Sequence, residues 1–416
     1  MKKSLILAAL VLISTGCFAQ KNPLVKKAKN YAMAETPDFA AARAAIAEAL
    51  EADPTAENYY WAGMIGYQEL TQENYNQYMG KGVDQAKAGA AAMESYRYWL
   101  KADELAMIPT LDKKGREVVD TKTRNNITKK MLEYYKQQEL VKYGIYLDEK
   151  KDYEAAYNAF MAHLSIPELP MMQNEKMQKE MPRDTTYMLY KYYAAVFAVQ
   201  AEMHPEAVVL LADLKDGETE PVYVNKFLYQ EYLTVADTAK AIAVLRDAIV
   251  RFPEEEWFIQ SFVNIAIQTN REQEAVDYFT GLIERNPNDM LFYQKRGVMN
   301  ELLEHFDAAM ADFDKAIELA PNSADAYAGK GRVYYNQAVK LNEAANNIMD
   351  NREYKKALDE MNEVFRQSMP YFEKAHELEP TRESFLQTLK TLYYRFRAEP
   401  GMQEKYDATV QLLESL

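Results

Sequence analysis

The chain has 416 residues, of which 48% are hydrophobic and 27% charged, and its formal net charge is −14. Nucleic acids and anionic membrane surfaces are bound through clustered Lys and Arg, so this acidic balance disfavours both as partners. Only 14 Gly and 15 Pro occur beside 31 Tyr, a composition that favours helices joined by short loops.

Residues 1–19 have the composition of an export signal. Two lysines precede an apolar run at 5–13 that is too short to span a bilayer, and small residues follow at the end of the segment. We expect cleavage after Ala19 and a periplasmic protein. The alternative is an outer-membrane lipoprotein lipidated at Cys17, although Ser14 stands where such a signal usually has Leu.

Cysteine usage and hydropathy restrict the chemistry of the mature chain. Cys17 is the sole cysteine of the sequence, so a chain cleaved after Ala19 contains no disulfide, thiolate metal site or cysteine nucleophile. No later stretch approaches the roughly 20 apolar residues of a transmembrane helix. We therefore expect a protein held by its hydrophobic core, with no cofactor, no metal and no membrane-spanning segment.

The strongest pattern is an internal repeat of 34 residues between about 188 and 335. In each of four units an alanine is followed four residues later by a large apolar residue, and a proline ends each of the last three units. This spacing indicates repeated helix pairs, because small residues let two helix axes approach while the large residue fills the groove to the next unit. The recurring positions are Ala207 with Leu211, Ala241 with Leu245, Ala275 with Phe279, Ala309 with Phe313, and the closing prolines Pro253, Pro287 and Pro321.

The unit that ends at Pro321 matches a known repeat at several positions. The chain therefore resembles tetratricopeptide repeat proteins of the exported, envelope type. The resemblance implies an all-α fold, a right-handed α-solenoid of antiparallel helix pairs (the tetratricopeptide superhelix), and proteins or peptides as partners. The residues that carry it are Tyr293, Gly297, Ala309, Phe313, Ala316 and Pro321.

The same spacing extends more loosely over nearly the whole mature chain. It predicts about nine helix pairs, two of them with extended helices or insertions. We expect an irregular N-terminal array with insertions at 20–221 and a regular C-terminal array at 222–416. The outward matches are Ala42 with Ile46, Ser95 with Trp99, Ala156 with Phe160, Ser368 with Phe372, and a final pair at 382–416.

Three segments depart from the repeat length. Residues 337–366 favour helix, and Asp350-Asn351 at their middle gives a turn and a helix start, so we expect a long helical finger there. Excess sequence also occurs around 74–82, and an irregular stretch lies at 167–183. Two interpretations stay open for these segments, added binding function and simple variation in loop length.

Catalytic motifs are missing from the sequence. It has no nucleophile elbow, phosphate loop, HExxH or dinucleotide fingerprint. The histidines are far apart in the chain, and an extended solenoid would not bring them together. They lie in or near second helices, and we expect them to be exposed structural residues. We therefore expect a protein that is not an enzyme, with no catalytic residues. The four histidines are His163, His204, His305 and His376.

Two clusters have a structural interpretation beside a chemical one. Glu254-Glu255-Glu256 resembles a cation site, but it follows Pro253 where a helix starts and where carboxylates are favoured by unpaired amides. Methionines cluster at 171–181. They can pack on the stack, form an adaptable partner surface, or bind soft copper.

The resemblance also implies a concave groove, lined by the first helix of each pair, that holds an extended peptide or a partner helix. The family's clamp of Lys and Asn for a terminal carboxylate is not reproduced, since this chain has Gln260, Ser261, Gln294 and Lys295 there. Carrying the register over gives the candidate groove residues Trp257, Gln260, Asn264, Gln268, Leu291, Gln294, Val298, Glu301, Asp325, Ala328, Arg332, Tyr335 and Asn336.

These patterns favour a protein–protein interaction scaffold in the periplasm or at the outer membrane. It would bind partner proteins or peptides through the groove or the inserted segments. The alternative is a glycan-binding or small-molecule-binding protein, because Trp61, Trp99 and Trp257 could stack on sugar rings.

Overall fold

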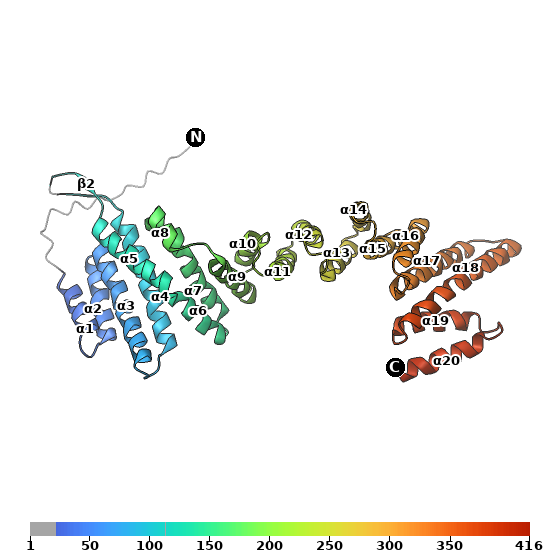
Figure 1. Cartoon of the computed structure of the whole chain (residues 1–416), viewed down its shortest axis with the longest axis horizontal. Coiled ribbons are helices and arrows are strands. Elements are labelled where there is room, and N and C mark those ends of the chain that lie inside the picture. The colour runs from blue at the N-terminus through green and yellow to red at the C-terminus, as the bar shows by residue number, and fades with distance from the viewer. Residues whose placement is uncertain (1–21, 113) are drawn as a thin grey trace. The chain divides into compact units, whose positions relative to one another are not determined.

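The computed structural model describes residues 22–112 and 114–416. The predicted export signal at 1–19 lies outside these residues. The chain divides into two compact units that meet at Val244–Leu245, inside one helix (Figure 1), and each unit is described by itself. The sequence placed its boundary earlier, between 221 and 222.

The N-terminal unit consists of helices, a small hairpin and two short 3-10 turns. Most helices begin at an Asp or Thr whose side chain accepts a hydrogen bond from an amide of the first turn, as at Asp38, Thr55, Asp84 and Asp152. Its helices are α1 (Pro23–Ala32), α2 (Phe39–Ala52), α3 (Ala56–Tyr78), α4 (Gln85–Ala106), α5 (Thr121–Gln137), α6 (Glu139–Glu149), α7 (Tyr153–Ser165), α8 (Glu175–Glu180), α9 (Thr185–Gln200), α10 (His204–Leu214) and α11 (Pro221–Thr234).

Helix α12 (Thr238–Arg251) crosses the boundary, and the C-terminal unit continues as helices alone. Its elements are α13 (Glu256–Gln268), α14 (Glu272–Arg285), α15 (Met290–Leu302), α16 (Phe306–Leu319), α17 (Ala324–Ala345), α18 (Asn351–Leu378), α19 (Glu383–Arg395) and α20 (Met402–Ser415). Helix α13 starts at Glu256, which agrees with the helix-start interpretation of the three glutamates.

The described residues form an all-α solenoid, and the predicted fold class and number of pairs are confirmed. Eight pairs are in contact, α1–α2, α3–α4, α6–α7, α9–α10, α13–α14, α15–α16, α17–α18 and α19–α20, and α11 and α12 take the remaining place in chain order. The repeated alanines are fully buried where the helices meet, and Phe279 and Phe313 have no exposed surface. Buried apolar side chains at these contacts supply the main stabilisation of each pair.

Two pairs are longer than the others, as the sequence predicted. Helices α3 and α4 have 23 and 22 residues, and α17 and α18 have 22 and 28. Figure 1 shows α17 and α18 running side by side as a finger. Asp350 caps α18 by accepting hydrogen bonds from the amides of Arg352 and Glu353 at 2.9 Å, so this helix starts where the sequence placed it.

The segment between α4 and α6 contains elements that the repeat pattern did not predict. The strands β1 (Thr110–Leu111) and β2 (Glu117–Val118) form an antiparallel hairpin (Figure 1), and α5 follows it as an additional helix that packs mainly on α4. The turn depends on Asp112, whose carboxylate accepts hydrogen bonds from backbone amides of the turn, and on Gly115 at φ +70°.

The methionine cluster lies in the irregular stretch that ends before α9. Here the chain forms two 3-10 turns, Ile166–Glu168 and Pro170–Met172, and the short α8. Met177 on α8 is partly exposed, whereas Met172 and Met181 are completely buried and Met171 nearly so. Their burial supports the packing interpretation, because a partner surface or a copper site needs thioethers that a ligand can reach.

Candidate functional site

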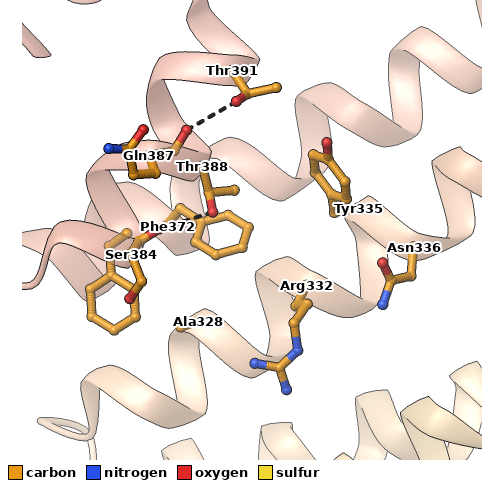
Figure 2. Close-up of a pocket in the computed structure, with 10 residues that line it drawn as sticks. Ala328, Arg332, Tyr335, Asn336, Phe372, Ser384, Gln387, Thr388 and Thr391 are labelled. Carbon is orange, nitrogen blue, oxygen red and sulfur yellow. Dashed lines mark hydrogen bonds between the residues drawn. The ribbon is translucent and has the colours of Figure 1, made fainter. Parts of the chain in front are cut away.

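Two neighbouring pockets in the C-terminal unit are lined mainly by the first helices of its pairs. The polar pocket, of about 400 Å³, lies between α13, α15, α17 and the residue before α19. The aromatic pocket, of about 470 Å³, lies between α17, α18 and α19 (Figure 2). Arg332 lines both, so the two pockets form one groove across four successive first helices.

Most of the candidate groove residues line one pocket or the other. The polar pocket contains Gln260, Asn264, Gln294, Val298, Glu301, Asp325 and Arg332. The aromatic pocket contains Ala328, Arg332, Tyr335 and Asn336.

The remaining candidates, Trp257, Gln268 and Leu291, line neither pocket. Trp257 is half-buried, and its ring packs edge to face on Phe258 with centroids 5.3 Å apart.

A buried carboxylate joins α15 to α17 beneath the groove. The side chain of Glu301 is 4% exposed and accepts hydrogen bonds from Arg332 Nε at 2.7 Å and Nη2 at 2.6 Å. Asn336 Nδ2 donates a further bond at 2.8 Å. A buried carboxylate is tolerated when its charge is paired and its lone pairs are satisfied. Arg332 has five N–H donors and uses its Nε and Nη2 atoms here, so the others are available to a ligand in either pocket.

Lys295 lies at the centre of the polar pocket. Its Nζ donates to Gln260 Oε1 at 3.0 Å, and Gln260 Nε2 donates in turn to Asn264 Oδ1 at 2.9 Å. Burial lowers the pKa of the Lys295 ammonium, while the Asp325 and Glu256 carboxylates oppose that shift. Within residues 22–112 and 114–416, Lys295 has no carboxylate at ion-pair distance.

The edge of the polar pocket is closed by an ion pair between two repeats. Arg382, the residue before α19, lies 2.7 Å from the Asp325 carboxylate of α17 and 3.1 Å from Glu379. Beneath the groove, Arg296 and Asn300 of α15 donate to the buried Asp312 carboxylate of α16. These bonds hold the first helices at fixed spacing, so the groove is preformed.

The aromatic pocket combines a ring-lined base with a wall of hydroxyl groups. Phe372 and Phe385 are each 5% exposed and form the base. On α19 the hydroxyl of Thr388 donates to the carbonyl of Ser384 at 3.1 Å, and Thr391 donates to Gln387 at 3.0 Å (Figure 2). Because each hydroxyl proton is used within the helix, the two threonine oxygens can act toward a ligand only as acceptors.

Sequence reasoning missed the α19 wall and two of the pocket cations. Ser384, Thr388 and Thr391 recur at helical spacing on the first helix of the last pair, which is the signal that would have found them. Lys295 was noted as a departure from the family's clamp but was not placed in the groove, and Arg382 lies before its helix.

The histidines do not come together in the structure. His163 is 1% exposed and stacks on Tyr135 with ring centroids 4.6 Å apart, so the expectation that it is exposed is wrong. Its helix is covered on a second side by α9, which the repeat spacing alone did not reveal. His204 Nδ1 lies 2.8 Å from Glu231 on the following helix. In the other unit, His305 is the residue before α16 and His376 lies in α18.

The described part of the chain offers neither a metal site nor a membrane span. No group of three or more His, Cys, Asp or Glu in it is arranged to hold a metal ion. None of the helices described is both long and apolar enough to cross a membrane.

Comparison with known proteins identifies one repeat of the groove. Residues 292–323 match the tetratricopeptide repeat family. A peptide N-acetylglucosaminyltransferase that uses UDP-N-acetylglucosamine, from Giardia intestinalis, is 28% identical over 134 residues, which are 32% of this chain and 9% of that protein. The human SGT1 homolog is 34% identical over 80 residues, which are 19% of this chain and 22% of that protein. The chain thus spans less than a quarter of the length of these curated relatives.

Solved structures of repeat proteins are also similar to the chain. A tetratricopeptide repeats protein from Bacteroides fragilis has a TM-score of 0.36 at 14% identity, covering 62% of this chain and 98% of that one. The C-terminal part of a tetratricopeptide repeat-containing protein from Cytophaga hutchinsonii has a TM-score of 0.39 at 14% identity, covering 66% and 95%. Residues 292–323 span most of α15 and all of α16, so the centre of the candidate groove is a tetratricopeptide repeat.

Proposed function

We propose that this protein is an exported interaction scaffold that binds partner proteins or extended peptides along the groove of α13, α15, α17 and α19. Proteins with tetratricopeptide repeats generally mediate protein–protein interactions. The observation that carries the proposal is the pair of pockets joined at Arg332, on helices held at fixed spacing. We place the protein in the periplasm or at the outer membrane because of the composition of residues 1–19.

The chemistry of the groove supports an extended ligand. Amides, cations and hydroxyl groups follow one another over four helices, and each can meet a different residue of a bound chain. The arginines, the acidic residues and Lys295 are engaged in ion pairs or hydrogen bonds with one another or with amides. Such an arrangement serves recognition, and no pair of groups in it is set up as nucleophile and base.

The tryptophans do not support the glycan alternative. Trp99 is completely buried, and its Nε1 donates to the Tyr60 carbonyl at 3.2 Å. The ring of Trp61 is covered by the Lys29 ammonium, 3.3 Å from the ring centroid. Trp257 lies against Phe258 outside both pockets. None of the three therefore offers a sugar-stacking face in this groove.

The proposal is tested by capturing envelope proteins on the immobilised chain and on variants of it whose groove is blocked. The mature chain from Gln20 is immobilised beside Asn264→Trp and Thr391→Trp, which place a bulky ring in the polar and the aromatic pocket. Ala311→Trp is the matched control, because Ala311 is exposed on α16, the second helix of the same repeat. We expect a stoichiometric partner that is retained by the control and lost from at least one groove variant.

Circular dichroism of all four proteins establishes that they are folded. A partner that binds the groove variants as well as the unchanged chain would place the binding surface elsewhere. The absence of any captured protein, after cross-linking as well as under native conditions, would contradict the scaffold function.

A further inference from the structure

We infer that the polar pocket recognises an acidic side chain within the bound peptide and that Lys295 is the residue that binds its carboxylate. The inference rests on the proposed function, because it names the chemistry of the partner in the same groove. It makes Lys295 a specificity-determining residue.

Lys295 differs from the other cations of the pocket in its partners. Arg332 is paired with Glu301 through a two-pronged contact, and Arg382 is paired with Asp325. Lys295 Nζ instead donates to the neutral Gln260 oxygen at 3.0 Å. In the described residues it is therefore the pocket cation whose positive charge is not compensated by a contacting carboxylate.

The ion pairs around the pocket leave Lys295 without a contacting counter-ion. The pocket lining contains the cations Lys295, Arg332 and Arg382 and the carboxylates Glu301 and Asp325, and the two carboxylates are paired with the two arginines. Glu256 also faces Lys295, from the start of α13. An ammonium that burial has partly removed from water gains more from a new counter-ion than an exposed one does.

The position of Lys295 favours a side chain of the peptide over its terminus. The polar pocket extends from Asn264 on α13 to Arg382, and the aromatic pocket continues beyond Arg332 to Thr391 on α19. A peptide that fills both pockets passes Lys295 and continues on either side. The carboxylate that such a peptide presents to Lys295 belongs to the side chain of an Asp or Glu. An apolar side chain of the same peptide fits over Phe372 in the aromatic pocket.

The experiment selects peptides from a library of random decapeptides displayed in a loop, so that both ends of each peptide continue. Selection uses the immobilised mature chain, with Asn264→Trp and Thr391→Trp to remove peptides that bind outside the groove. Enriched peptides are synthesised with acetylated and amidated ends, and their affinities are measured by fluorescence anisotropy. Each is compared with a form in which its Asp or Glu is replaced by Asn or Gln.

Three variants of the protein isolate the contribution of Lys295. Lys295→Gln removes the charge and Lys295→Arg retains it. Lys315→Gln is the matched control, because Lys315 lies on α16 of the same repeat and pairs with Glu318 at 2.6 Å.

We expect enriched peptides to carry an internal acidic residue. Its replacement should weaken binding about tenfold or more in the unchanged protein, since hydrogen bonds to charged groups contribute at that level. The same replacement should have little further effect in Lys295→Gln, while Lys295→Arg and Lys315→Gln behave like the unchanged chain.

The other outcomes overturn the inference in distinguishable ways. Groove-dependent peptides without an acidic preference, or an unaltered affinity in Lys295→Gln, would refute the role of Lys295 and leave the scaffold function standing. Binding that requires a free terminal carboxylate would refute the inference that the bound carboxylate belongs to an internal Asp or Glu. A library without any groove-dependent peptide would contradict the inference and the peptide-binding function together.

Discussion

The ring of Phe313 on α16 occupies the space that a side chain at Gly329 on α17 would need. A Cβ built at Gly329 would lie 2.3 Å from Cε1 of that ring. Phe313 is completely buried, so its ring cannot move out into solvent to make room. The absence of a side chain at Gly329 therefore lets the tetratricopeptide repeat at 292–323 pack against the next helix.

We expect Gly329→Ala to destabilise the C-terminal unit by about 1–3 kcal/mol, the usual effect of overpacking a filled core. The measurement is the free energy of unfolding in urea. Gly281→Ala is the control, because Gly281 is also helical but nothing lies within 4 Å of its added Cβ. That substitution should stabilise α14 by about 0.5–1 kcal/mol through helix propensity. Equal effects at the two glycines would contradict the packing described here.

Ala309 belongs to the same buried cluster as Phe313, and its register is testable in the same way. Ala309 is completely buried, whereas Ala311 on the same helix is exposed. Ala309→Leu should lower the free energy of unfolding by about 1–3 kcal/mol through overpacking, and Ala311→Leu should leave it within about 0.5 kcal/mol. An unchanged melting temperature in Ala309→Leu would show that this alanine does not set the helix spacing.

His163 gives the N-terminal unit a defined dependence on pH. Burial lowers its pKa to about 4 from an ordinary value near 6.5, and its Nδ1 has no hydrogen-bond partner among the described residues. The folded state therefore holds the neutral ring. Stability from this residue is complete above pH 6.5 and is lost as the pH falls from there toward 4, because the unfolded chain binds the proton first.

The expected loss is about 2 kcal/mol between pH 7.5 and pH 5. It is measured as the difference in unfolding free energy between the wild type and His163→Phe, a substitution that retains the ring stack on Tyr135. The variant should lose less stability on acidification than the wild type. The exposed His305→Gln, in the other unit, controls for substitution of a histidine as such. Parallel pH profiles for wild type and His163→Phe would contradict the prediction.

The predicted export signal is testable through the N-terminus and the location of the expressed protein. Expression of the full sequence in a Gram-negative host should yield a periplasmic protein whose first residue is Gln20, as read by N-terminal sequencing. Cys17→Ser distinguishes the two routes, because it abolishes lipidation but leaves a small residue near the cleavage site. A protein that stays in the membrane fraction until Cys17 is replaced would support the lipoprotein alternative, and an uncleaved cytoplasmic chain would contradict export.

The repeats could be predicted because their signal is local in sequence. Ala309 and Phe313 are one helical turn apart, and every unit needs the same small and large residues at that place. The start of α18 was predictable for the same reason, since Asp350 is a strong N-cap beside a helix-forming run. Features that depend on residues a few positions apart can therefore be predicted from the sequence alone.

Features that depend on distant residues could not be predicted in this way. His163 is buried because Tyr135 from α5 and Tyr190 from α9 cover its ring, and neither follows from the repeat spacing. In the groove, Trp257 was placed by register alone, but its ring turns onto Phe258. Whether Lys295 has a carboxylate partner depends on which carboxylates are already paired with arginines of other elements.

Glu301 is the residue whose replacement should separate groove structure from overall folding. Glu301→Gln keeps the shape of the side chain but removes the charge that pairs with Arg332. Loss of one partner from a fully buried pair costs about 3–5 kcal/mol. Because the Arg332 side chain is 43% exposed, solvent screening reduces this, and we expect about 1–2 kcal/mol. Glu318→Gln, whose pair with Lys315 lies on the exposed face of α16, should cost less than about 0.5 kcal/mol.

The measurement combines urea unfolding with peptide binding. Arg332 lines both pockets, so releasing its guanidinium from Glu301 should weaken the binding of groove peptides even when the protein is fully folded in the absence of urea. Glu318→Gln should leave binding unchanged. A Glu301→Gln protein that binds such peptides normally would mean that the Arg332–Glu301 pair serves only to join α15 to α17. A protein that loses binding with its helix content intact would make the pair a positioning device for the groove.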